Sequence, residues 1–212
     1  MGKNKRETSR KPGNRAAKPT LLIVCEGETE WKYFRDIKNR YRASWIRPEL
    51  SNHATPLEII DRAKKYQREL KGKGLDVETW VVFDAEREVD ESPRHYKEAI
   101  QKAQAAGLMV ANSSPCFEYW ILLHFDGAAS VVDPKRAELE LAKADRIPGY
   151  EKPDLPYEEL WGIVQTDKPL AAARAKREDH TDMGHNPRYA RPVTYVDELI
   201  YRIRVVATRP VR

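Results

Sequence analysis

The sequence predicts an α/β protein: a parallel sheet flanked by helices, with a C-terminal helical extension. Apolar runs typical of buried strands alternate with segments of helical periodicity through about residue 125, which favours strands joined by helical crossovers. Two of the apolar runs stop at an acidic residue, Glu26 or Asp84. The chain has 212 residues, of which 41% are hydrophobic and 33% charged. This composition suits one globular domain with an appendage.

The elements expected in the first part of the chain follow from local patterns. Thr20–Cys25 is a nearly uninterrupted apolar run and predicts a buried strand, and apolar residues at helical spacing predict a helix over Thr29–Tyr41. A weaker strand is expected over Ser44–Arg47. A helix is expected from Pro56 to about Leu70, because proline suits a first helical position. Thr79–Asp84 predicts the second clear buried strand.

The second part of the chain begins in the same alternating manner and then becomes mainly helical. A helix is expected from Pro93, with Ser92 as its N-cap, to about Ala106. Further along, the patterns predict a strand over Leu108–Ala111, an apolar helix over Cys116–Phe125, a charged helix over Lys135–Asp145, a Pro-rich connection over 147–156, a basic helix over Lys168–His180, a loop over 182–192 and an amphipathic helix over Tyr195–Val206.

The positive charge of the chain is concentrated at its N-terminus. The net charge is +5, yet residues 1–18 hold seven lysines and arginines beside a single acid, so the remainder is close to neutral. We expect 1–18 to be a disordered basic tail, 19–126 to be the α/β core and 127–212 to be the helical extension packed on it. A basic tail adds salt-sensitive affinity for phosphates or simply raises solubility, and both readings stay open.

Several classes of protein are disfavoured by composition. No apolar run has the length of a membrane span, and the basic N-terminus lacks the apolar stretch of a secretory signal. Cys25 and Cys116 lie in apolar contexts without metal-binding spacing, so we expect two buried, reduced thiols. A cytoplasmic protein with no membrane partner is the resulting expectation.

Acidic residues follow two of the predicted strands at the point where each strand ends. Glu26 follows the first strand, and Asp84 and Glu86 end the second, where extended backbone would place Asp84 and Glu86 on the same side. If the two strands are neighbours, the three carboxylates come within reach of one divalent cation such as Mg²⁺ or Mn²⁺. The alternative is that Glu26 only caps a helix and that the other two acids pair with Arg87.

These same residues carry a resemblance to known families. The strand ends resemble the Toprim arrangement, and the spelling Glu-Gly-x-Thr-Glu is similar to the Toprim domains of the OLD nucleases. Taken with Asn112–Phe125 and the later Asn186-Pro187 and Val193-Thr194 pairs, they resemble the RloB-like family over most of residues 20–205. The matching stretches are Val24-Cys-Glu-Gly-Glu-Thr-Glu30 and Val82-Phe-Asp-Ala-Glu86.

The resemblance implies a Toprim-like fold and a Mg²⁺- or Mn²⁺-dependent nuclease, from genes associated with restriction-modification and phage-defence loci. It implies that Glu26 acts as general base or acid and shares the metal with Asp84. Glu86 stands where the Toprim pattern has an aspartate, which displaces the carboxylate by one methylene. Glu30 matches the OLD-like acid that would hold a second metal.

Two further groups of residues are candidates for accessory roles. Glu118 opens the apolar helix, where capping is the alternative, and Asn112 precedes it within hydrogen-bonding reach of a carboxylate or phosphate. Nucleic acid, DNA or RNA, is the expected partner, and a solvated helix face is the alternative for its basic contacts. The expected contacts are Arg174, Lys176, Arg177 and Arg188.

A second hypothesis belongs to a different functional class. The Asp-x-Glu departure at Glu86 leaves open a non-catalytic module that binds nucleic acid or a partner protein encoded nearby, because a fold does not determine a function. A phosphotransfer or primase-like enzyme is a third reading. It is disfavoured because the sequence lacks a Gly-rich loop for a nucleotide phosphate.

Overall fold

The computed structural model describes most of the chain from residue 18 onward. The described residues are 18–52, 55–85, 93–125, 131, 133–154 and 167–208. The predicted tail up to residue 17, the N-cap at Ser92 and the domain boundary at 126–127 lie outside them. In chain order the elements are β1 (Thr20–Cys25), α1 (Glu28–Arg40), β2 (Ile46–Leu50), α2 (Pro56–Gly72), β3 (Val77–Val82), α4 (Pro93–Ala105), β4 (Met109–Val110), β5 (Ser113–Ser114), α5 (Phe117–Leu122), α6 (Pro134–Leu141), α8 (Lys168–Asp182), the 3₁₀ helix η1 (Pro187–Tyr189), β6 (Val193–Thr194) and α9 (Val196–Thr208).

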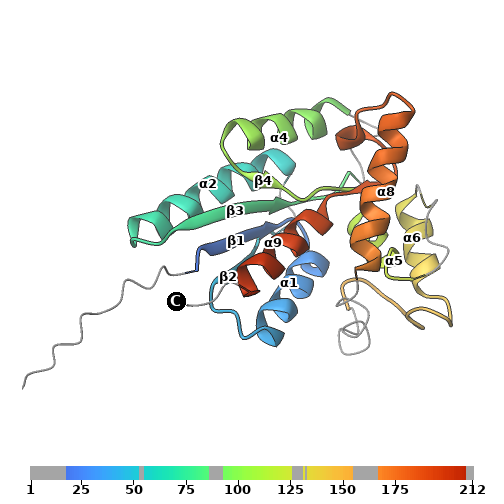
Figure 1. Cartoon of the computed structure of the whole chain (residues 1–212), viewed down its shortest axis with the longest axis horizontal. Helices are drawn as coiled ribbons and strands as arrows, with labels where there is room; N and C mark the ends of the chain where they lie inside the picture. Colours follow the sequence, from blue (N-terminus) through green and yellow to red (C-terminus); the bar gives the residue numbers. More distant parts are fainter. Residues whose placement is uncertain are drawn as a thin grey trace, which may run out of the picture.

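The central sheet has four parallel strands in the order β2-β1-β3-β4 (Figure 1). The chain passes from β1 outward to β2 on one side and then crosses to β3 on the other side of β1. The strand order therefore reverses between β1 and β3, and ligands in open α/β sheets bind outside the carboxyl ends of the strands at such a reversal. The predicted α/β class, a parallel sheet flanked by helices, is confirmed.

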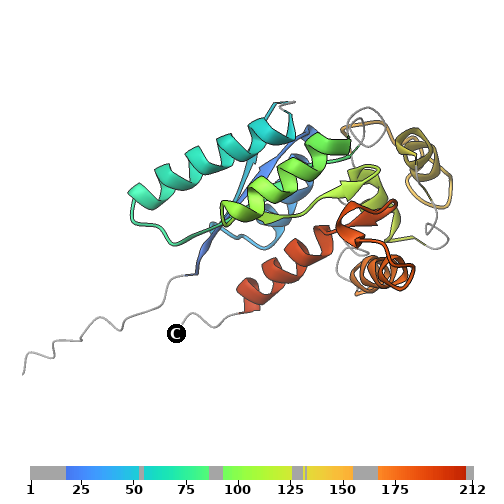
Figure 2. The ribbon, with the colours of Figure 1, turned by 90° about the horizontal axis from the view of Figure 1, so that it is seen from above.

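Both faces of the sheet are covered, as the continuous apolar run of β1 predicts. Leu21, Ile23 and Cys25 belong to a core shared with α1, α5 and α9. Leu22 and Val24, which point the other way, belong to a second core shared with α2 and α4. The two views agree that α2 and α4 lie on one face and α1 and α9 on the other (Figures 1 and 2). Strand β1 is consequently the centre of the molecule.

The C-terminal helix α9 shares the first of these two cores. Val196, Leu199, Ile203 and Val206 are all buried there together with residues of β1. Their spacing is the helical periodicity that the sequence showed over Tyr195–Val206. The last helix therefore packs beside α1 and covers the sheet that begins the chain.

Several bounds differ from the expectations: the charged helix covers Pro134–Leu141, and the strand expected over Leu108–Ala111 is only Met109–Val110. Strand β2 runs from Ile46 to Leu50 and contains Pro48, which we expected to end it. Proline is tolerated there because β2 lies at the edge of the sheet, where one side of the strand needs no partner. The apolar helix is shorter than predicted and ends at Leu122, and the regular part of β3 covers Val77–Val82.

A small second sheet was not predicted. Strands β5 and β6 pair antiparallel, with Ser113 opposite Thr194 and Ser114 opposite Val193. The two side-chain hydroxyls of Ser113 and Thr194 lie 3.0 Å apart in a buried hydrogen bond. This pairing ties the region before α9 to the carboxyl end of the central sheet, so two segments separated by 81 residues become neighbours.

The cysteines agree with the expectation from sequence. Cys25 and Cys116 are both buried and both free. A membrane span is not found among the described helices, none of which combines the length and the apolar character that crossing a bilayer requires.

Candidate metal-binding and catalytic site

Glu26 and Asp84 meet at the carboxyl ends of two neighbouring strands. Glu26 directly follows β1 and its backbone N–H donates to the Val82 carbonyl at 3.0 Å. The Asp84 backbone N–H in turn donates to Glu26 Oε2 at 3.0 Å. Because β1 and β3 pair in parallel register, these two acids lie side by side at the reversal point of the sheet. The sequence predicted this adjacency only on the condition that the strands were neighbours.

The Asp84 carboxylate is oriented by the first turn of α5. Its Oδ2 accepts a hydrogen bond from the Phe117 backbone N–H at 2.9 Å. The N-cap residue of this helix, Cys116, makes no side-chain cap, so Asp84 satisfies one of the free amides of the helix start. The backbone on either side is held by β5, since the Ala85 N–H donates to the Ser113 carbonyl at 3.0 Å. Asp84 is therefore a fixed group.

Glu30 lies in the first turn of α1 and is only 4% exposed. A side chain at Gly27 would place its Cβ 2.7 Å from Glu30 Oε2, so glycine is what allows this carboxylate to approach the start of the helix. Burial, and after it the nearby carboxylates of Glu118 and Glu26, raise the pKa of Glu30 to about 8. Glu30 therefore lies close enough to Glu118 and Glu26 for their charges to raise its pKa.

Glu118 is buried, at 1% exposure, and is held by two side chains from the Pro-rich connection. The Tyr150 hydroxyl donates to Glu118 Oε1 at 2.9 Å, and Lys152 Nζ lies 3.1 Å from Glu118 Oε2. Lys152 Nζ also lies 3.1 Å from Glu138 Oε1. A buried charge is tolerated when it is paired and hydrogen-bonded in this way. The sequence reasoning identified Glu118 but not its partners, since nothing local marks a contact across more than thirty residues.

The fit of this group of acids to a divalent cation rests on carboxylate oxygens. Glu86 lies outside the described residues. Within the part of the chain that the structure describes, no group of three His, Cys, Asp or Glu side chains is arranged to hold a metal ion. Glu26 and Asp84 supply two carboxylates, and Mg²⁺ commonly binds through one or two carboxylates with waters and substrate phosphates completing its shell. Glu26 and Asp84 are donors of the kind that Mg²⁺ and Mn²⁺ prefer, and binding of either metal here stays a prediction.

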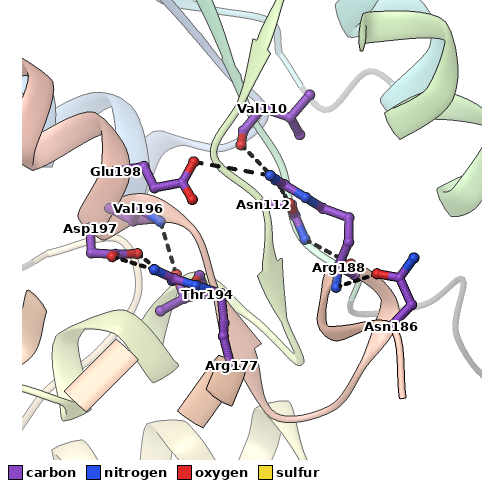
Figure 3. A network of polar contacts seen from close by, with 9 residues as sticks. All are labelled: Val110, Asn112, Arg177, Asn186, Arg188, Thr194, Val196, Asp197 and Glu198. Atoms are coloured by element: carbon purple, nitrogen blue, oxygen red, sulfur yellow. Dashed lines mark hydrogen bonds and ion pairs between the residues drawn. The ribbon is translucent and has the colours of Figure 1, made fainter. Parts of the chain in front are cut away.

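Asn112, predicted as an accessory residue, is fully buried and bonded within the fold. Its Nδ2 donates to the Tyr96 hydroxyl at 2.6 Å. Its Oδ1 accepts from Arg188 Nη1 at 2.9 Å, and Figure 3 shows these two residues. Its backbone carbonyl accepts from the Tyr195 N–H at 2.9 Å. Asn112 thus links β4 and β5 to the segment around η1. Its neighbour Ser113 belongs to β5, the strand that holds the backbone beside Asp84.

Two of the four predicted nucleic-acid contacts are engaged in the fold (Figure 3). The Arg188 guanidinium lies 3.4 Å from the Tyr195 ring centroid and donates to the Val110 carbonyl at 3.0 Å, which covers the outer edge of β4. Arg177 forms a two-point ion pair with Asp197, at 2.6 and 2.7 Å. Both arginines therefore have a clear structural role.

The other two predicted contacts lie at the surface of α8. Arg174 is exposed, and Lys176 is partly exposed and 3.7 Å from Asp179. Contact between nucleic acid and any of the four basic residues stays a prediction.

The fold and the site define a class of protein. It is an α/β protein in which the two central parallel strands each end at an acid, at the reversal point of the sheet. The family model described as RloB-like protein matches residues 21–203, from the start of β1 into α9. The chain belongs to the RloB-like family, as its motifs had indicated. No curated protein and no solved structure shows significant similarity to it.

Proposed function

We propose that this protein is a Mg²⁺- or Mn²⁺-dependent nuclease that hydrolyses phosphodiester bonds of foreign nucleic acid. The observation that carries the proposal is the direct contact of Glu26 and Asp84 at the reversal point of the sheet, where the Asp84 N–H donates to Glu26 Oε2 at 3.0 Å. Parallel strands that end side by side are the place where open α/β sheets bind ligands, and two carboxylates at that place are donors that a divalent cation prefers.

The crowding of acids around this contact supports the same proposal. Burial and the neighbouring carboxylates raise the pKa of Glu30 to about 8, which means that another negative charge is unfavourable there. A bound divalent cation reverses this effect, because it favours the charged form of every carboxylate near it. Positive charge is therefore favoured among these acids, and Lys152 supplies one such charge at Glu118.

Each acid has a proposed part in the reaction. Glu26 and Asp84 would hold the cation, with Glu86 as a third ligand, and the cation would stabilise charge on phosphate oxygens and lower the pKa of a bound water. Glu26 would also assist proton transfer to or from the reacting water. Glu30 and Glu118 would act as accessory acids, Glu118 being held in place by its two partners from the 147–154 segment.

The substrate and the setting are proposed on separate grounds. Exposed positive charge at Arg174 and Lys176, together with the basic residues of 1–18, suits a polyanion. The role in defence against phage nucleic acid follows from the RloB-like and Toprim resemblance and not from any contact in the fold. A protein partner encoded nearby is compatible with both.

The test is cleavage by purified protein of labelled single- and double-stranded DNA and RNA, with Mn²⁺ or with EDTA. We expect cleavage with Mn²⁺ only, and its loss in Glu26→Gln and Asp84→Asn, which keep the size of each side chain. Glu69→Gln is the matched control, because Glu69 is an exposed carboxylate on α2 and is not one of the acids proposed to act in the reaction. Equal activity in all four proteins would refute the assignment, and unchanged melting temperatures would exclude misfolding as the cause of a loss.

A second candidate function is a non-catalytic module that binds nucleic acid or a partner protein. The observation in its favour is that the described residues form no three-ligand group for a metal. The two functions differ in their response to metal. A cation-binding site should raise the melting temperature with millimolar Mn²⁺ by mass action, and Asp84→Asn should abolish that rise. A binding module should show neither effect and should retain nucleic acid without cutting it.

A further inference from the structure

A cavity of about 710 Å³ lies beside β3, and neither Glu26 nor Asp84 is among its lining residues. Its floor includes Thr79 and Trp80 of β3, and its walls come from α2, α8, α9 and the residues before β4. Trp80 precedes Asp84 by four residues, which corresponds to roughly 13 Å along an extended strand. The cavity is therefore a separate feature of the surface, and the proposed reaction does not use it.

The cavity exists because β4 is too short to cover β3. β4 pairs only with Trp80 and Val81, so within the described chain Val77–Thr79 has a strand neighbour on the β1 side alone. Gly107, with φ +69, makes the turn that leads into β4, and a residue with a side chain would be strained in that conformation. Because of the position of this turn, β4 begins to pair with β3 only at Trp80. Helices α2 and α9 stand on opposite faces of the sheet beside this gap (Figures 1 and 2).

One part of the lining is apolar and exposed. Met109 is 45% and Tyr201 60% exposed, and both line the cavity. Leu170 and the ring of Trp80 continue the same surface deeper in. Large apolar side chains that remain open to water in one cavity favour the binding of a flat or apolar group.

Most of the charges in the lining neutralise each other. Arg202 forms a two-point ion pair with Glu78, with Nη2 to Oε2 at 2.6 Å, and Arg177 pairs with Asp197. The third acid in the lining, Glu198, lies 4.0 Å from an arginine outside it. None of these acids is therefore left to attract a cation.

Two cations of the lining stay available. Arg174 of α8 and Lys71 of α2 are exposed, and neither side chain has a hydrogen bond or ion pair with a described residue. They come from helices on different sides of the cavity. Arg174 thus leaves positive charge in the same cavity as the apolar surface of Met109 and Tyr201, which is a combination that suits an anion with a flat ring.

We propose that this cavity binds a nucleotide, with its phosphate at Arg174 and its base against Met109 and Tyr201. The volume falls within the range of pockets for small ligands, about 300–1,000 Å³. A guanidinium is well suited to phosphate oxygens, and aromatic side chains stack on any base. The site lies beyond the proposed nuclease activity, but it shares Arg174 with the basic surface proposed for nucleic acid, so binding of mononucleotides and of oligonucleotides has to be compared.

The test is calorimetric titration with AMP, GMP, CMP and UMP in EDTA. The Glu26→Gln protein is used so that the proposed metal site at Glu26 and Asp84 does not contribute. At least one nucleotide is expected to bind. Arg174→Glu should weaken it about tenfold or more, since charge reversal removes an attractive contact and adds a repulsive one. Tyr201→Ala should weaken it about fivefold to tenfold through lost stacking. Lys65→Glu is the matched control, an exposed cation of α2 outside the cavity lining.

Inorganic phosphate and adenosine, titrated separately, divide the ligand into its two halves. Phosphate binding should respond to Arg174→Glu and adenosine binding to Tyr201→Ala. The proposal is overturned if no nucleotide binds, or if Lys65→Glu weakens binding as much as Arg174→Glu. It is also overturned if an oligonucleotide binds through Arg174 more than tenfold tighter than any mononucleotide, which would identify a groove for a strand.

Discussion

The pair formed by Arg177 and Asp197 offers the sharpest test of the reasoning, because Arg177 was predicted as a nucleic-acid contact and is found inside the fold. The two side chains are only 13% and 5% exposed. Arg177 donates to both Asp197 oxygens, at 2.6 and 2.7 Å, and also to the Thr194 carbonyl at 2.6 Å. Replacement by methionine keeps an unbranched apolar stem and removes the guanidinium with its charge. Asp197 is then left buried without its partner.

The expected loss in the free energy of unfolding is about 3 kcal/mol. Removing one partner of a buried pair costs about 3–5 kcal/mol, and the lower value applies because Asp197 lies in the first turn of α9, where the helix dipole favours negative charge. For a chain of this size the loss corresponds to a fall of about 6–12 °C in the melting temperature. Urea unfolding of Arg177→Met, compared with Arg174→Met on the same helix, measures it.

The double variant Arg177→Met with Asp197→Leu separates the ion pair from general damage to the helix. It should recover at least about 2 kcal/mol relative to the sum of the single variants, because an apolar pair can replace a buried ionic one. A loss below about 1 kcal/mol in Arg177→Met, equal to that in Arg174→Met, would refute the structural role. It would also restore Arg177 to the candidate nucleic-acid contacts.

Three further predictions concern other buried groups. Lys152→Met should tighten Mn²⁺ binding about fivefold, because the substitution removes a positive charge 3.1 Å from Glu118. The rise of the melting temperature with Mn²⁺ measures the affinity, and weaker binding in the variant would contradict the prediction. Burial lowers the pKa of His124 to about 4, so the unfolded chain takes up the proton first as the pH falls below about 6.5. Stability should then decrease by about 3 kcal/mol between pH 6.5 and pH 4, and His124→Phe should flatten that slope in urea unfolding; an unchanged slope would exclude the histidine as its source. Tyr33→Phe should cost about 1–3 kcal/mol in thermal unfolding, because the Trp120 Nε1–H donates to the Tyr33 hydroxyl at 3.0 Å and would lose its acceptor; a loss well under 1 kcal/mol would show that another acceptor replaces it.

Much of the fold could be predicted because its elements are locally consistent. The strand Thr20–Cys25 was predicted with its observed bounds, and the helix from Pro56 differs from its predicted end by two residues. Thr55 forms a capping box with Glu58 at the start of that helix, so the local signal there is strong. Strand β2 was placed two residues early, because its proline argues against a strand everywhere except at a sheet edge.

The two central acids of the candidate site were predictable for a topological reason. An apolar run that ends in an acid marks the carboxyl end of a strand, and parallel strands end at the same rim. Glu26 and Asp84 needed only the strand order to become neighbours. The partners of Glu118 could not be predicted in this way, since Tyr150 and Lys152 lie in a connection with no periodicity to relate it to α5.

The sequence by itself determined the α/β class, the buried strands that end in acids and, through its motifs, the RloB-like family. Each of these depends on residues within a few positions of one another, so periodicity and spelling are sufficient. Only the tertiary structure decided that Arg177 and Arg188 are held within the fold, that Asn112 is a buried link, and that a cavity opens beside Trp80. These features depend on contacts between segments far apart in the chain. Such contacts are set by which faces pack together, and no local pattern records that choice.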